Sequence, residues 1–271
     1  MINSNELSSK IRFCLTMGGS MSIIVAEKIR KGGAEQMKSN PIVRNALAEF
    51  KENELIVASK LYREKLSGLI GEAAYYKTLQ RMCESGELVK IAKGTYHLPK
   101  VSKYGIVPPS EKEIISAFTE NETGTVVGYS LYNALNLTTQ ISKTITVMSS
   151  ALEGLTKSIR NVVVHQVPLE FSQEITSMVH GLEVLQNFST IQDINYSAFL
   201  AYTERLAESF NAGAFAEIVS AKTYKKSTIS FLREILNYYK VDHNLNEYLS
   251  SLSEYKHPKM EELYEATRIY H

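Results

Sequence analysis

The chain has 271 residues, of which 44% are hydrophobic and 22% charged, and its formal net charge is +1. These proportions exclude wholesale disorder and are typical of a globular protein with a packed core. No run approaches the roughly 18 consecutive apolar residues of a membrane span, and the N-terminus does not resemble a secretory signal. We therefore expect a cytoplasmic protein in which Cys14 and Cys83 are free thiols.

The charge is distributed unevenly along the chain. Residues 1–100 contain 16 Lys and Arg against 10 Asp and Glu, whereas residues 101–190 contain 5 against 8 and residues 191–271 contain 9 against 11. A basic first third indicates that this end of the molecule meets nucleic acid. Ordinary variation in surface charge explains the same asymmetry equally well.

The first elements in chain order are helical. Residues 1–40 predict a helical leader, broken at Gly18-Gly19-Ser20. Pro41 suits the first turn of the next helix, in which apolar residues recur at helical spacing. Val57, Leu61 and Leu66 continue this spacing and predict a second helix, which is preceded by the short apolar run Leu55-Ile56-Val57.

A third helix and a hairpin complete this first unit. The helix is predicted from Glu72 to Ser85 and is ended by Gly86. Residues 88–99 predict two short strands joined through Lys93-Gly94, because a tight tip needs a positive φ. In a winged helix-turn-helix, helices are followed by a hairpin. We therefore expect this fold over residues 41–100.

The third helix and the hairpin carry the residues that we expect to bind DNA. Tyr75, Leu79 and Met82 share one helix face, which should pack against the earlier helices. The opposite face then presents groups that neutralise phosphates or hydrogen-bond to base edges in the major groove. A solvated helix face and a charged strand edge would give the same pattern. The predicted DNA-binding set is Tyr76, Lys77, Gln80, Arg81, Lys90, Lys93 and Thr95.

The rest of the chain predicts an α+β architecture. Lys100 to Pro109 is expected to be a linker, and residues 108–186 a mixed α/β domain opened by the capping-box spacing of Ser110 and Glu113. Residues 187–271 show mostly amphipathic helical spacing and predict a helical C-terminal region. Strands are expected at residues 125–127, 143–149 and 159–167, and helices at 129–137, 198–210, 215–221, 228–239 and 245–252.

Two segments resemble a known protein family. Residues 79–99, which include Gly86-Glu87-Leu88 and Lys93-Gly94-Thr95-Tyr96, resemble the winged-helix end of AbiEi-type antitoxins of type IV (abortive infection) toxin–antitoxin systems. Residues 130–147, with Leu137-Thr138-Thr139-Gln140 before a strand, look like a second segment of that family. The similarity covers approximately residues 40–185.

The resemblance implies two activities. The winged helix would bind inverted repeats of double-stranded DNA in its own promoter and repress transcription. The remainder of the protein would counteract a nucleotidyltransferase toxin, with or without a stable complex between the two proteins. No cofactor or metal and no membrane partner is implied.

Two other classes of function compete with this interpretation. Gly18-Gly19-Ser20 is similar to the glycine-serine turn of a nucleotidyltransferase, but the only two aspartates, Asp193 and Asp242, cannot supply its clustered magnesium ligands. No P-loop, HExxH or Gly-x-Ser-x-Gly motif is present, so we expect no enzyme. The alternative is a stand-alone regulator or an interaction module, since the C-terminal region is rich in tyrosine.

Overall fold

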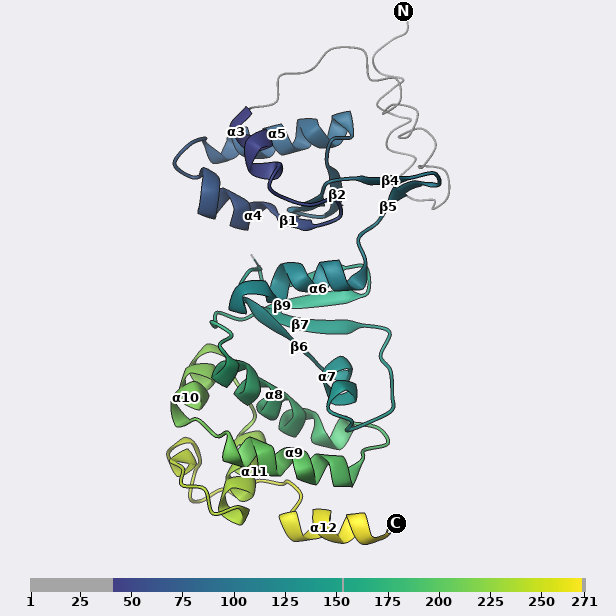
Figure 1. Ribbon diagram of the computed structural model, residues 1–271. Helices are drawn as coiled ribbons and strands as arrows, with labels where there is room; N and C mark the ends of the chain where they lie inside the picture. Colours follow the sequence, from purple (N-terminus) through teal and green to yellow (C-terminus); the bar gives the residue numbers. More distant parts are fainter. Residues whose placement is uncertain (1–40, 153, 270–271) are drawn as a thin grey trace, which may run out of the picture. The chain divides into compact units, whose positions relative to one another are not determined.

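The computed structural model describes residues 41–152 and 154–269, and it shows a mixed α+β protein (Figure 1). The chain divides into two compact units, residues 1–117 and 118–271. The predicted leader over residues 1–40 lies outside the described residues. Within the described ranges, no helix combines the length and the apolar character that crossing a membrane requires.

The first unit combines helices with a small antiparallel sheet. The strands of this sheet lie in the order β1-β3-β2, so β3 is the central strand. A separate hairpin, β4–β5, follows. The helical elements are α3 (Pro41–Leu47), α4 (Ala58–Leu61), the π-helical turn η1 (Tyr62–Leu66) and α5 (Glu72–Ser85). The strands are β1 (Leu55–Val57), β2 (Val89–Ala92), β3 (Thr95–His97), β4 (Lys100–Ser102) and β5 (Gly105–Val107).

Two predictions for this unit were wrong. The second helix was expected from Val57, but residues 55–57 form β1, in which all three side chains are buried, and the helix starts at Ala58. The expected linker over residues 100–109 instead contains the hairpin β4–β5. Its register pairs Val101 with Ile106, and such pairing satisfies backbone groups that a linker would leave to water.

The core of the first unit confirms the predicted inner face of α5. Tyr75, Leu79 and Met82 are buried in one cluster with residues of α3, α4 and the sheet. The Tyr75 hydroxyl donates a hydrogen bond of 3.0 Å to the carbonyl of Ala58. The helix ends as predicted, with Gly86 in the left-handed conformation at φ 81°.

The helix α6 (Glu111–Thr119) begins with the predicted capping box. The Glu113 amide donates to Ser110 Oγ at 3.3 Å, and the Ser110 amide donates to Glu113 Oε2 at 2.6 Å. These bonds hold the Glu113 carboxylate, so its pKa is lowered from 4.5, first by the Ser110 amide and then by the Ser110 hydroxyl.

The second unit is a four-stranded sheet packed with helices. The strands lie in the order β6-β7-β9-β8, and only β7 and β9 run parallel among the pairs of this sheet. The strands are β6 (Gly124–Val127), β7 (Ile145–Ser149), β8 (Thr156–Ile159) and β9 (Val162–Gln166). The helices are α7 (Tyr129–Ala134), α8 (Gln173–Asn187), α9 (Tyr196–Glu208), α10 (Ala212–Ala221), α11 (Lys226–Tyr238) and α12 (Met260–Ile269), with 3-10 turns η2 (Glu120–Glu122), η3 (Phe188–Thr190) and η4 (Leu245–Tyr248).

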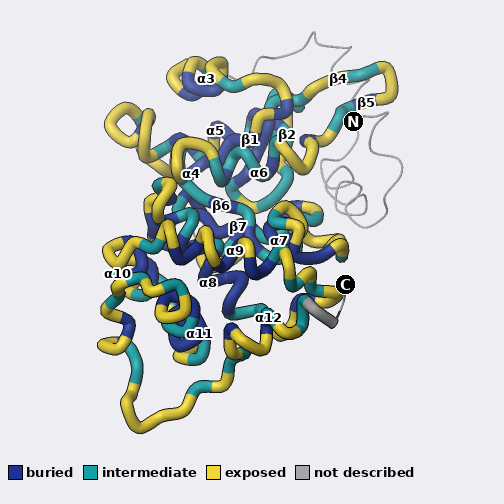
Figure 2. The backbone as a smooth tube through the Cα atoms, turned by 60° about the horizontal axis from the view of Figure 1, so that its bottom comes forward, coloured by how far each residue is buried: buried dark blue, intermediate teal, exposed yellow. Residues whose placement is uncertain are grey.

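The central helix of the second unit is α8, which the sequence did not predict. It packs against β6, α9, α10 and α11, and much of it is buried (Figure 2). The predicted boundary at residues 186 and 187 falls within its last turn, and one hydrophobic core extends from Val127 to Leu263. The C-terminal helices are therefore continuous with the mixed region in packing.

Two further corrections concern elements of this unit. The strand expected over residues 159–167 is β9, which starts only at Val162, because Arg160 takes a positive φ of 55° and turns the chain after β8. Strand β8 was not predicted, apart from Ile159. The helix expected over residues 245–252 is limited to the 3-10 turn Leu245–Tyr248.

Candidate nucleic-acid interface

The outer face of α5 is polar and accessible. Lys77 and Gln80 are exposed, while Tyr76 and Arg81 are half-buried at the margins of the face. The Gln80 amide donates a hydrogen bond of 3.0 Å to Glu84, which lies one turn further along the helix. Cationic and amide groups therefore occupy the second and third turns of this face, and a carboxylate follows at the C-terminal end.

One flank of α5 adjoins the hairpin β2–β3. Burial raises the pKa of the Cys83 thiol to about 11, while the nearby Lys90 ammonium opposes this shift. The pKa of Tyr96 is raised, first by burial and then by the neighbouring Cys83 and Tyr76. These interactions place the exposed Lys90 of β2 beside the same helix that carries Lys77.

The environment of Cys83 argues against a redox role for it. A thiol with a raised pKa is protonated at neutral pH, whereas reactive cysteines are thiolates in electropositive, accessible surroundings. Cys83 is half-buried against the core of the first unit. The Cys83 side chain therefore packs against the core at the flank of α5.

The hairpin tip is held against the start of α4. Gly94 takes a positive φ of 69°, and its carbonyl accepts a hydrogen bond of 3.0 Å from the Ala58 amide. Lys93 is exposed at this fixed tip. The structure thus brings together two cationic side chains of the hairpin, Lys90 and Lys93, with the polar face of α5 on one compact scaffold.

Thr95 is a correction to the predicted DNA-binding set. Its side chain has 0% exposure, because β3 is the central strand and Thr95 pairs with Val57 of β1 on one side and Ala92 of β2 on the other. A buried hydroxyl cannot contact a duplex, so Thr95 supports the hairpin and lies outside the interface.

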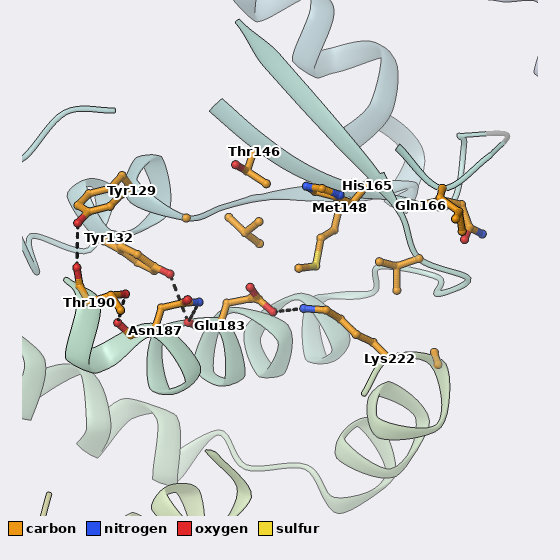
Figure 3. A pocket seen from close by; sticks show the side chains of 15 residues that line it. Tyr129, Tyr132, Thr146, Met148, His165, Gln166, Glu183, Asn187, Thr190 and Lys222 are labelled. Carbon is orange, nitrogen blue, oxygen red and sulfur yellow. Dashed lines mark hydrogen bonds and ion pairs between the residues drawn. The ribbon is translucent and has the colours of Figure 1, made fainter. Parts of the chain in front are cut away.

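The second unit contains a separate pocket of about 500 Å³, shown in Figure 3. The sequence analysis did not identify it. Its most buried charged side chain is Glu183 on α8, 9% exposed, which forms an ion pair with Lys222. The Lys222 ammonium also lies 4.4 Å from the centroid of the Tyr224 ring. In the sequence, Lys222 lies in a short basic cluster with Lys225 and Lys226.

The polar groups around this pocket mostly bind one another. Tyr132 donates a hydrogen bond of 3.3 Å to the Glu183 carbonyl, and Asn187 donates to the same carbonyl at 2.9 Å. Tyr129 donates to the carbonyl of Thr190 at 3.0 Å, as the dashed lines in Figure 3 show. Over residues 41–152 and 154–269, no group of three His, Cys, Asp or Glu side chains converges as a metal site would require. The hydrogen bond from Tyr132 and the ion pair with Lys222 therefore connect α8 to neighbouring elements.

Comparisons with known proteins give a family without an assigned function. Residues 45–170 match a protein family described as "Family of unknown function (DUF6088)". No curated protein matches the chain. The crystal structure of the RV2827C protein from Mycobacterium tuberculosis is 11% identical, covers 72% of this chain and 75% of that chain, and aligns with a TM-score of 0.34. A structural similarity at that score carries no argument about function.

Proposed function

We propose that this protein is a DNA-binding antitoxin that represses its own promoter through a winged helix-turn-helix over residues 41–100. The observation that carries the proposal is the polar outer face of α5, with Lys77 and Gln80 exposed beside the exposed Lys90 of the hairpin. Cationic and amide side chains on one exposed helix are what a duplex requires for phosphate contacts and base readout.

The order of elements supports the winged-helix part of the proposal. A helix, a strand, three further helical elements and a two-stranded hairpin follow one another from α3 to β3. In this arrangement α5 acts as the recognition helix, whose N-terminal half enters the major groove. Lys77 and Arg81 bind phosphates or guanine, and Gln80 pairs with adenine. The hairpin, with Lys90 and Lys93, contacts the adjacent backbone.

The antitoxin part of the proposal is supported by the resemblance of residues 79–99 and 130–147 to AbiEi-type antitoxins. The family match over residues 45–170 covers both segments, which contain the second half of α5, the hairpin and the first residues of β7. On this proposal the protein acts in the cytoplasm and counteracts a nucleotidyltransferase toxin, and it is not itself an enzyme.

The DNA-binding proposal is tested by the salt dependence of binding. Duplex from the region upstream of the gene is titrated by fluorescence anisotropy over a range of salt concentrations. Each lost phosphate contact should reduce the slope of log K against log salt by about 0.9, so Lys77→Ala/Arg81→Ala should reduce it by about 1.8. The control Lys143→Ala/Lys256→Ala removes two exposed cations of the second unit and should leave the slope unchanged. A folded Lys77→Ala/Arg81→Ala variant with the wild-type slope would refute the role of α5.

The antitoxin proposal is tested by co-expression with the product of the neighbouring gene. Growth should be restored when this chain accompanies a toxic nucleotidyltransferase. A chain that binds upstream DNA but gives no relief from the toxin is a stand-alone regulator. A chain that neither binds DNA nor gives relief is an interaction module.

A further inference from the structure

A second hairpin leaves the first unit directly after the three-stranded sheet. Among the described residues, strands β4 and β5 pair only with each other, in the register Lys100 with Val107 and Ser102 with Gly105. We call residues 100–107 the β4–β5 arm. In Figures 1 and 2 it extends away from α3, α4 and α5. A two-stranded hairpin without a packed face is marginally stable alone, so its order needs a local cause.

That cause is the chemistry of the arm's tip. The Ser102 hydroxyl donates a hydrogen bond of 3.0 Å to the Gly105 carbonyl and accepts one of 3.2 Å from the Tyr104 amide. Gly105 takes a φ of 113°, which only glycine adopts readily. The Lys103 ammonium lies 4.9 Å from the centroid of the Tyr104 ring. The tip is thus a fixed cation and ring rather than a loose loop.

The arm carries two large side chains that the other described residues leave exposed. Tyr104 is 83% exposed and Val101 is 55% exposed. Lys100 and Lys103 are exposed beside them. Lys100 lies near the Glu113 carboxylate, which the Ser110 cap already engages.

The charge of the surrounding sequence points to a polyanion. Between Glu87 and Glu111 the chain has four lysines, at positions 90, 93, 100 and 103, and no acidic residue. The hairpin β2–β3 carries two of these lysines and the arm carries the other two. The cores of protein interfaces are depleted in lysine, whereas nucleic-acid contacts are enriched in basic side chains, so the arm fits a duplex better than a protein partner.

We propose that the β4–β5 arm is a second DNA-contacting element, and this inference rests on the proposed function. Lys100 and Lys103 each neutralise a backbone phosphate, and Tyr104 lies against the sugar-phosphate edge. At about 3.4 Å per residue, three residues carry the tip about 10 Å beyond the sheet, comparable with the width of about 12 Å of the major groove. The arm therefore extends the footprint beyond the base pairs that α5 reads.

The test compares the salt dependence of DNA binding in charge-neutral variants that keep side-chain length. Lys100→Gln/Lys103→Gln should reduce the slope of log K against log salt by about 1.8, equally on upstream and unrelated duplexes. The matched control Lys143→Gln/Lys256→Gln should retain the wild-type slope. An arm variant with the wild-type slope and an unchanged thermal melt overturns the inference while leaving the role of α5 intact. A wild-type protein without affinity for any duplex overturns both.

A second measurement locates the contact directly. Tyr104→p-benzoylphenylalanine should form a photo-crosslink to a labelled upstream duplex, and the crosslink should weaken as salt is raised. The same substitution at Leu252, which is 96% exposed in the second unit, provides the control. Crosslinks from position 104 only to a second copy of the chain, with bound duplex present, would show that the arm is a protein contact instead.

Discussion

The ion pair between Glu183 and Lys222 predicts an unequal cost of removing its two partners. The side chain of Glu183 is 9% exposed and that of Lys222 is 26% exposed. Lys222→Ala leaves the buried Glu183 carboxylate on α8 without its ion-pair partner. Glu183→Ala leaves a lysine whose flexible stem can carry its ammonium into the pocket water.

The magnitudes follow from these exposures. Breaking a fully buried pair by removing one partner costs about 3–5 kcal/mol. Because one side of this pair is open to water, we expect Lys222→Ala to lower the free energy of unfolding by about 2–3 kcal/mol and Glu183→Ala by about 1 kcal/mol. The double variant should cost less than the sum of the two, with a coupling energy of about 1 kcal/mol.

The assay must report on the second unit alone, since a protein of two units need not unfold in one step. The chain contains no tryptophan, so amide hydrogen exchange read by mass spectrometry over Gln173–Asn187 is the direct measure of α8 stability. Lys222→Ala should accelerate exchange there more than Glu183→Ala does. Equal costs, or a larger cost for Glu183→Ala, would refute the assignment of Glu183 as the buried partner.

Three further predictions concern stability. Gly86→Ala forces a side chain into the left-handed conformation at the end of α5 and should cost about 1–2 kcal/mol by urea denaturation. The lowered pKa of Glu113 means that its cap stabilises the fold above pH 4.5 and loses this effect as pH falls, so the stability advantage of wild type over Glu113→Gln should shrink in acid. Burial lowers the pKa of His180 below 6.5, so stability should fall as pH drops below 6.5, and His180→Gln should flatten this dependence in denaturation curves at pH 7.5 and 5.5.

The parts of the fold that the sequence predicted are those with a strong local signal. Helical periodicity and a following glycine defined α5 to the residue, and the Ser110 and Glu113 spacing defined the start of α6. The turn at Arg160 carries no glycine, so the predicted strand ran through it from Ile159, and β8 was missed. The helix α8 was missed although Ile175, Met178, Val179, Leu182 and Leu185 recur at helical spacing, and all five are buried in the structure.

The error at Thr95 shows why the site needed the structure. Strand β1 has three residues, all buried, so it lacks the alternation that identifies a strand, and it runs directly into a helix. Without β1, the hairpin has two edge strands and Thr95 lies on an open wing. Pairing of Val57 with Thr95 makes β3 central and buries it, which leaves β2 as the edge that presents Lys90. A three-residue pairing between distant segments therefore decides which hairpin residues can reach a duplex.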